Sequence, residues 1–145
     1  MAVIEESIHI KCPADKVFTY TIDAKNWPIW QSIIIEAEQT SKETMGVGTA
    51  FKGVVRMMGL SMKWIAEVKE YEQNTKWTKN ITCRGMHISE HVTYDPVGEL
   101  TIFTIRYDMK LSGFMKLFSP MIVSTMRKET TKSLAQLKSI LETQT

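Results

Sequence analysis

The order of the apolar patterns is the feature that most constrains how this chain folds. A short alternating segment at 3–11 is followed by Pro13 and by two brief helical patterns that carry Trp27 and Trp30. Segments of period two then fill most of the chain from about 33 to 111, and this period is typical of strands. A single amphipathic helical pattern comes last. This order predicts a curved antiparallel sheet wrapped around a C-terminal helix.

Length and composition indicate one globular domain. A chain of 145 residues is long enough to bury a sizeable core, so we expect a single domain over 1–145. The hydrophobic fraction of 43% and the charged fraction of 23% are ordinary for a soluble protein. The net charge is only +2 and basic residues do not cluster into runs, so we expect no nucleic-acid surface.

Cysteine usage and the N-terminus predict the compartment. Cys12 and Cys83 stand far apart and form no CxxC pattern, which argues against a disulfide framework. The N-terminal residues do not resemble a signal peptide. No apolar stretch approaches the ~20 residues that a membrane-spanning helix needs. We therefore expect a cytoplasmic protein without a transmembrane segment.

Turn signals divide the region of period two into six strands. The motif Asp95-Pro96-Val97-Gly98 fits a type I turn, with Asp first, Pro second and Gly fourth. Connections this short predict an antiparallel meander rather than βαβ units. The other expected reversals lie at Gly46 to Gly48, Gly59, Asn74-Thr75 and Arg84-Gly85.

The last helix is predicted from Pro120 to about Leu141. Apolar residues recur there at steps of three and four, which places them on one side of the helix. We expect this stripe to lie across the concave, apolar face of the sheet. The stripe consists of Ile122, Met126, Thr130, Leu134, Leu137 and Leu141.

Two segments resemble a known family. The stretch IHIKCPADKVFTYTIDAKNWPIWQ has the Pro13, Val17-Phe18, Asp23 and Trp30 pattern of the polyketide cyclase/dehydrase-like branch of the START-related (Bet v 1-like) superfamily, and SPMIVSTMRKETTKSLAQLKSILE is similar to its last helix. The resemblance implies the α+β helix-grip fold: a seven-stranded curved antiparallel sheet, in the order β-α-α-β6-α, around the C-terminal helix and a hydrophobic cavity. The family includes lipid and sterol carriers, quinone-binding proteins, aromatic cyclases, hydrolases and chaperone activators, so it leaves the activity open.

The alternation of side chains predicts which residues line the cavity. Methionines are frequent among them and suit a pocket for irregular apolar ligands, although methionine fills an ordinary core equally well. Trp27 and Trp30 are expected to pack the short helices on the sheet. The predicted lining is Phe51, Val55, Met57, Met62, Trp64, Ile88, Glu90, Phe103, Ile105, Tyr107, Phe118, Ile122 and Met126.

Candidates for chemistry are few. Glu90, Tyr94 and Tyr107 are the catalytic candidates, because a carboxylate in an apolar pocket can act as an acid or base. We favour the simpler interpretation that Glu90 pairs with a cation or lies at a wet cavity mouth. His87 and His91 lie ~13 Å apart in a strand, so we expect no metal site. The sequence shows no phosphate loop and no nucleophilic triad, and we expect no cofactor.

Three functions fit this pattern. We favour a carrier or sensor that binds a small hydrophobic molecule, such as a lipid, a quinone or a polyketide-like compound, between the sheet and the last helix. The first alternative is a cyclase or dehydratase in which Glu90 with Tyr94 or Tyr107 moves protons. The second is a module with a filled cavity that binds a protein partner; nothing in the sequence indicates such a partner.

Overall fold

The structure, a computed structural model, describes residues 2–42 and 44–143. Its elements follow the predicted order, with one strand, short helices, six strands and a long helix. They are β1 (Ala2–Ile10), α1 (Ala14–Ile22), η1 (Ala24–Asn26), α2 (Trp27–Trp30), β2 (Ile34–Gln39), β3 (Ala50–Met57), β4 (Leu60–Glu72), β5 (Lys76–Cys83), β6 (Met86–Val97), β7 (Leu100–Leu111), η2 (Gly113–Phe118) and α3 (Ser119–Thr143).

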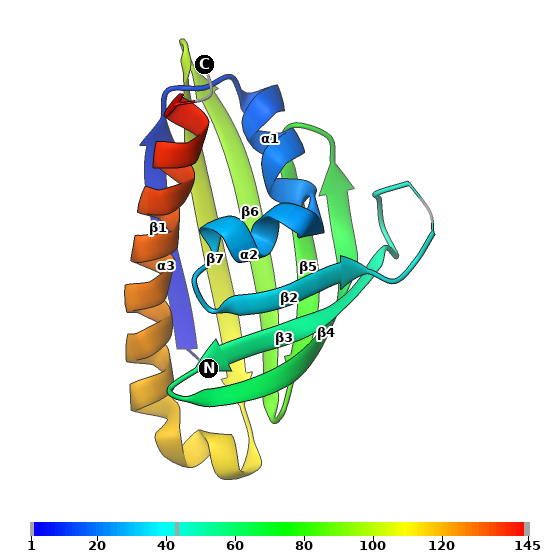
Figure 1. The fold of residues 1–145 in the computed structure, drawn as a ribbon, viewed down its shortest axis with the longest axis vertical. Helices are drawn as coiled ribbons and strands as arrows, with labels where there is room; N and C mark the ends of the chain where they lie inside the picture. The colour runs from blue at the N-terminus through cyan, green and yellow to red at the C-terminus, as the bar shows by residue number, and fades with distance from the viewer. Residues whose placement is uncertain (1, 43, 144–145) are drawn as a thin grey trace.

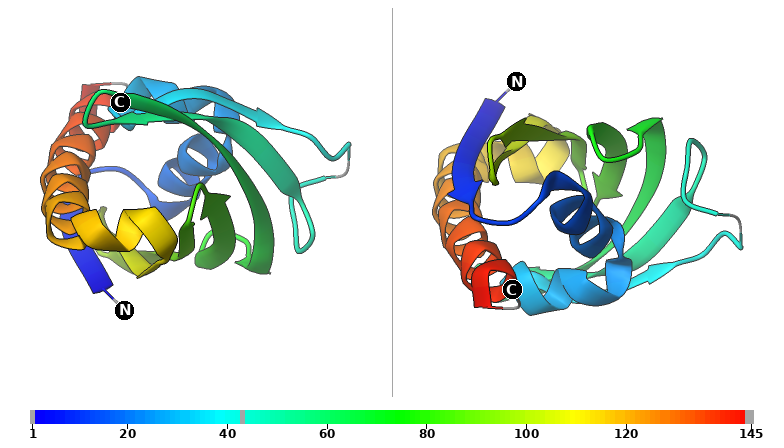
Figure 2. Two further views of the ribbon diagram at one scale, coloured as in Figure 1. Left: turned by 90° about the horizontal axis from the view of Figure 1, so that it is seen from below. Right: turned by 90° about the horizontal axis from the view of Figure 1, so that it is seen from above.

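All seven strands form one antiparallel sheet in the order β1-β7-β6-β5-β4-β3-β2. Strands β2 to β7 form a meander of consecutive neighbours, and β1 completes the sheet by pairing with β7. The sheet curves strongly, and α3 runs along its open side beside β1 (Figures 1 and 2). This arrangement confirms the predicted helix-grip fold.

Helix α3 buries the side that the sequence pattern predicts. Pro120 lies in its first turn, where the missing N–H breaks no helical hydrogen bond. All six residues of the predicted stripe, from Ile122 to Leu141, are buried. The opposite side of α3 is polar, and within 2–42 and 44–143 no helix is long and apolar enough to span a membrane.

The short helices cover one end of the concave face, as Figure 1 shows. The Asp23 carboxylate caps η1 by accepting a hydrogen bond from the Lys25 backbone N–H at 3.1 Å. Trp27 is fully buried, stacks on Trp77 with ring centroids 6.0 Å apart, and donates its Nε1–H to the Thr21 carbonyl. The side chain of Trp27 therefore packs the short helices onto the sheet, as predicted.

The hairpin turns predicted at Gly59, Asn74-Thr75 and Arg84-Gly85 are correct, and the one predicted at Asp95–Gly98 is wrong. Arg84 and Gly85 both have positive φ, 37° and 82°, as a tight two-residue hairpin turn requires. The predicted turn at Asp95–Gly98 is wrong, because β6 continues through Val97 and the chain reverses after it. The pairing of β6 with β5 ends at Thr93, so Pro96 lies beyond it and its missing N–H costs no hydrogen bond on that side.

Candidate functional site

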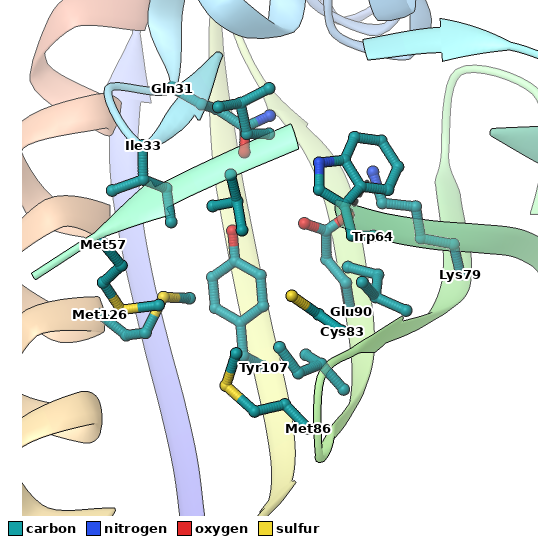
Figure 3. Close-up of a pocket in the computed structure, with 14 residues that line it drawn as sticks. Gln31, Ile33, Met57, Trp64, Lys79, Cys83, Met86, Glu90, Tyr107 and Met126 are labelled. Carbon is teal, nitrogen blue, oxygen red and sulfur yellow. Dashed lines mark ion pairs between the residues drawn. The ribbon is translucent and has the colours of Figure 1, made fainter. Parts of the chain in front are cut away.

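A cavity lies between the concave face of the sheet and α3 (Figure 3). Its volume is about 70 Å³, whereas a site for a drug-sized ligand measures ~300–1,000 Å³. The cavity therefore has room for part of such a ligand only. Its lining comes from β3 to β7, α3 and the segment around β2, and consists of Gln31, Ile33, Ile34, Val55, Met57, Trp64, Lys79, Ile81, Cys83, Met86, Ile88, Glu90, Tyr107 and Met126.

Methionines form the adjustable part of this lining. Figure 3 shows Met57 and Met126 side by side on one side of the cavity and Met86 below Tyr107. Methionine has three rotatable side-chain bonds and no branch, so it changes shape at little cost. These three side chains can therefore change rotamer with less strain than branched residues would.

A buried ion pair lies on the opposite side of the cavity. Lys79 on β5 faces Glu90 on β6, with 3.1 Å from Nζ to Oε2 and both side chains about 95% buried. The Lys79 ammonium also lies 3.6 Å from the centroid of the Trp27 ring, a cation–π contact. Burial lowers the pKa of Lys79, and the Glu90 charge opposes this shift. The expectation that Glu90 pairs with a cation is thus confirmed, although the pair is buried and not at a wet mouth.

Tyr107 places a hydroxyl beside this pair. It lies opposite Glu90 on the neighbouring strand β7, and Figure 3 shows its hydroxyl pointing toward the end of the cavity where Gln31 lies. Burial raises the pKa of Tyr107 well above its usual value, and the charge and hydrogen bonding of Glu90 raise it further. Tyr107 therefore keeps its proton at neutral pH and can donate a hydrogen bond.

Trp64 supplies a second donor. Its indole Nε1 is buried and has no hydrogen-bond partner within the described part of the chain. Such an unsatisfied donor costs ~1–3 kcal/mol. Gly53 makes room for this ring, since a Cβ there would lie 2.6 Å from Trp64 Cζ2 and 2.0 Å from the Glu36 carbonyl oxygen.

The residues predicted to line the cavity divide into three groups. Val55, Met57, Trp64, Ile88, Glu90, Tyr107 and Met126 line it. Ile105 adjoins a smaller hollow under α3, and Phe103 lies deeper, beside Trp30 and Tyr94. Phe51, Met62 and Ile122 are buried outside this lining, and Phe118 is 38% exposed on η2.

Tyr94 does not line the cavity, although it shares a smaller hollow with Glu90. Its hydroxyl is 2.5 Å from Thr21 Oγ1 and accepts a hydrogen bond from Trp77 Nε1 at 3.0 Å. Its ring packs edge-on against Phe18 and Phe103. Burial raises the pKa of Tyr94 despite these hydrogen bonds. The structure thus brings Glu90 and Tyr107 together at the cavity and gives the Tyr94 hydroxyl partners in the core.

Sequence reasoning missed Lys79, although a signal for it exists. Trp77, Lys79, Ile81 and Cys83 alternate along β5 with intervening polar residues. This alternation puts Lys79 on the apolar face, where a lysine is unexpected without a partner. Gln31 was missed because it lies in a connection without periodicity.

The described residues do not suggest a metal centre. No group of three or more His, Cys, Asp or Glu side chains that could hold a metal ion occurs in 2–42 and 44–143. His91 Nε2 lies 3.3 Å from Asp108 Oδ2, and its Nδ1 lies 3.2 Å from Thr78 Oγ1. His91 is therefore engaged with its neighbours in the sheet.

The fold is similar to that of solved structures of low sequence identity. The Zhui aromatase/cyclase from Streptomyces sp. R1128 superimposes with a TM-score of 0.83 at 13% identity, covering 97% of this chain and 93% of that one. A START superfamily protein from Mycobacterium smegmatis gives a TM-score of 0.80 at 17% identity, covering 99% of each chain. A protein from Thermus thermophilus gives 0.81 at 17% identity, covering 95% of each.

Sequence comparison shows the family. No curated protein matches this chain. Residues 1–142 match the model of a family described as polyketide cyclase / dehydrase and lipid transport, in accord with the resemblance of the first helices and the last one. With the helix-grip fold and the cavity between sheet and α3, this match over nearly the whole sequence shows that the chain belongs to the polyketide cyclase / dehydrase and lipid transport family.

Proposed function

We propose that the protein is a carrier or sensor for a small, mostly apolar molecule that carries a carbonyl oxygen, such as a quinone or a polyketide-like compound. The observation that supports this most directly is the buried Trp64 Nε1–H, which lines an apolar cavity without a partner in the described part of the chain. A carbonyl oxygen accepts hydrogen bonds and donates none, so it matches this donor. Lys79 and Glu90 pair with each other and the Tyr107 hydroxyl hydrogen-bonds Glu90, so the Trp64 Nε1–H is the donor left for the ligand.

The apolar wall supplies the affinity in this proposal. Burial of apolar ligand surface contributes ~25 cal/mol per Å². Since the cavity of about 70 Å³ holds only part of such a molecule, Met57, Met86 and Met126 must rotate on binding. The family description and the aromatase/cyclase neighbour support the general idea of a pocket for apolar compounds.

The test compares two ligands with the same carbon skeleton, one with two carbonyl oxygens and one without oxygen. The probes are 2,3-dimethyl-1,4-naphthoquinone and 2,3-dimethylnaphthalene, measured by isothermal titration calorimetry. We expect the wild type to bind the quinone about tenfold more tightly, and Trp64→Phe to lose most of this preference. Equal binding of both probes by the wild type would remove the proposed carbonyl recognition.

A second pair of variants tests whether the ligand enters this cavity. Met126→Trp fills the cavity and should abolish quinone binding. Met121→Trp makes the same change on the same helix at a side chain that is 58% exposed, and it should bind as the wild type does. Quinone binding that survives Met126→Trp in a folded protein places the ligand elsewhere. Native mass spectrometry of freshly purified protein, with solvent extraction, then identifies any ligand carried from the cell.

The cluster of Glu90, Tyr107 and Lys79 favours a second candidate function, an enzyme that moves a proton next to a carbonyl. Tyr107 and Trp64 would polarise the carbonyl oxygen while the Glu90 carboxylate removes a proton from the adjacent carbon. The test follows deuterium uptake by 2-tetralone in deuterium oxide by NMR. Faster exchange with the wild type than with Glu90→Gln supports the enzyme, and equal rates remove Glu90 as its base.

A further inference from the structure

One end of the molecule exposes a cluster of large apolar side chains. This basal patch consists of Phe114, Leu117 and Phe118 on η2 and Met121 in the first turn of α3, which are 69%, 76%, 38% and 58% exposed. The Phe114 and Phe118 rings lie 5.1 Å apart. Figure 1 shows η2 at the lower end of the molecule, below the sheet. Contiguous exposed apolar surface of this kind marks an interaction site.

The fold holds η2 in place without using these side chains. The Ser112 backbone N–H donates to the Gly85 carbonyl at 2.8 Å, which ties the start of η2 to the β5–β6 turn. Met115 is the buried residue of η2, and it packs so closely on Gly85 that a Cβ there would lie 3.2 Å from Met115 Cγ. Packing thus requires Met115, whereas the patch residues point away from the core.

The charges around the patch all have one sign. The turns and helix start at this end, residues 57–61, 83–87 and 109–128, contain no Asp or Glu. The same segments carry Arg84, Lys110, Lys116, Arg127 and Lys128, all exposed. None of these five takes part in an ion pair within the described ranges.

The opposite end of the sheet differs in charge. Because the strands are antiparallel, the β4–β5 and β6–β7 turns both lie toward that end, in the upper half of Figure 1. The β6–β7 turn carries Glu99, and at the β4–β5 hairpin Glu72 lies opposite Lys76. Charges of both signs thus occur at that end, whereas the turns beside the basal patch carry cations without carboxylates.

We propose that this basal surface docks on an anionic phospholipid bilayer. Large apolar side chains that enter the interface, together with lysine and arginine beside them, are the two components of peripheral membrane binding. A second copy of the chain fits less well, since a twofold contact through this patch would bring Arg84, Lys110 and Lys116 against their own equivalents. Docking would also place Met86, which follows Gly85 and lines the cavity, close to the bilayer surface.

The test is flotation of the purified protein with vesicles of phosphatidylcholine alone or of phosphatidylcholine mixed with phosphatidylglycerol. We expect binding to the mixed vesicles, weaker binding to the neutral ones, and loss of binding as salt is raised, because salt screens the attraction. Leu117→Asp should lower partitioning at least about tenfold. Ile65→Asp is the matched control, since Ile65 is 61% exposed on β4 outside the patch, and it should bind as the wild type does.

The charge contribution has its own pair of variants. Lys110→Gln with Lys116→Gln should lower partitioning into anionic vesicles roughly tenfold and leave neutral vesicles almost unaffected. Lys16→Gln with Lys25→Gln removes two charges near α1 and should change neither. Wild-type protein that does not float with anionic vesicles overturns the proposal, as do equal losses in Leu117→Asp and Ile65→Asp. A concentration-dependent dimer that Leu117→Asp dissolves, without vesicle binding, would assign the patch to a second copy instead.

Discussion

Lys79 and Glu90 form an ion pair inside the apolar face of the sheet, with 3.1 Å between Nζ and Oε2. They are direct partners in the β5–β6 ladder, so the backbone itself sets their separation. Taking two charges out of water is costly, and an apolar pair of similar size is often no less stable. Folding alone therefore gives little reason for this pair beside a cavity. This supports a role for it in the site.

Removing one member of the pair should destabilise the protein strongly. Lys79→Met leaves the Glu90 carboxylate buried and unpaired, so we expect a loss of ~3–5 kcal/mol in the free energy of unfolding. The double variant Lys79→Met, Glu90→Met should recover most of that loss. Urea denaturation measures both. The control is Lys52→Met, which breaks an exposed pair with Glu38 and should cost under ~1 kcal/mol; a similar cost at both lysines would contradict the importance of burial.

Tyr107 should make the protein less stable at high pH. Its pKa is raised in the folded state, so the folded protein holds this proton more tightly than the unfolded chain does. The stability that depends on protonated Tyr107 is fully present below the unfolded pKa of ~10 and is lost as the pH rises above that pKa.

Tyr107→Phe checks this. The variant should lose stability less steeply above about pH 10, by up to ~1.4 kcal/mol per pH unit. The pKa of Lys79 is lowered in the folded state, so below its unfolded pKa this group makes the protein more stable as the pH rises. It does so in both proteins, and the difference between their slopes therefore comes from Tyr107. Urea midpoints from pH 8 to 11 give the slopes, and equal slopes would show that Tyr107 does not titrate differently on folding.

The architecture was predictable because it depends on how regularly apolar residues recur along the sequence. The stripe of α3 repeats every three or four residues, and the strands alternate every two, so Leu134 or Ile105 could be assigned to the inside from spacing alone. The same rule finds the facing of Glu90 and Tyr107. The spacing of apolar residues does not show which positions along a strand lie next to the cavity. Met62 and Trp64 therefore share one face of the sheet, although only Trp64 lines the cavity.

The rest of the site depends on contacts between distant segments. Lys79 is explained by Glu90 and by the Trp27 ring, which comes from a helix 52 positions earlier in the chain (79 minus 27). The Asp95–Gly98 motif has ideal turn chemistry, yet the register of β6 with β7 overrides it. Neither the burial of Lys79 nor the position of the β6–β7 turn follows from a local sequence pattern, because each depends on which segments pack beside it in the fold.

Gly53 should be hard to replace. A Cβ would lie within 3 Å of both the Glu36 carbonyl and the Trp64 ring, so Gly53→Ala must displace the ring or the bulged edge of β2. We expect a loss of ~1–3 kcal/mol and a shift of tryptophan emission to longer wavelength. Gly46→Ala is the control, since its nearest neighbour would be 3.9 Å away; equal stability of the two variants would show that Trp64 has room to move.

Cys83 should report ligand entry. Burial raises the pKa of both thiols, Cys12 and Cys83, so both should react slowly with N-ethylmaleimide at neutral pH. Only Cys83 lines the cavity, while Cys12 lies near the end of β1 and accepts a hydrogen bond at its carbonyl from Thr101. A ligand in the cavity should therefore slow alkylation of Cys83 several-fold beyond any change at Cys12. Peptide mass spectrometry measures the two rates in one sample, with 2,3-dimethyl-1,4-naphthoquinone, which has no free position for thiol addition, as the ligand. A quinone bound in the cavity can shield only Cys83. Equal slowing of alkylation at both cysteines would therefore mean that the quinone binds elsewhere and stabilises the whole fold.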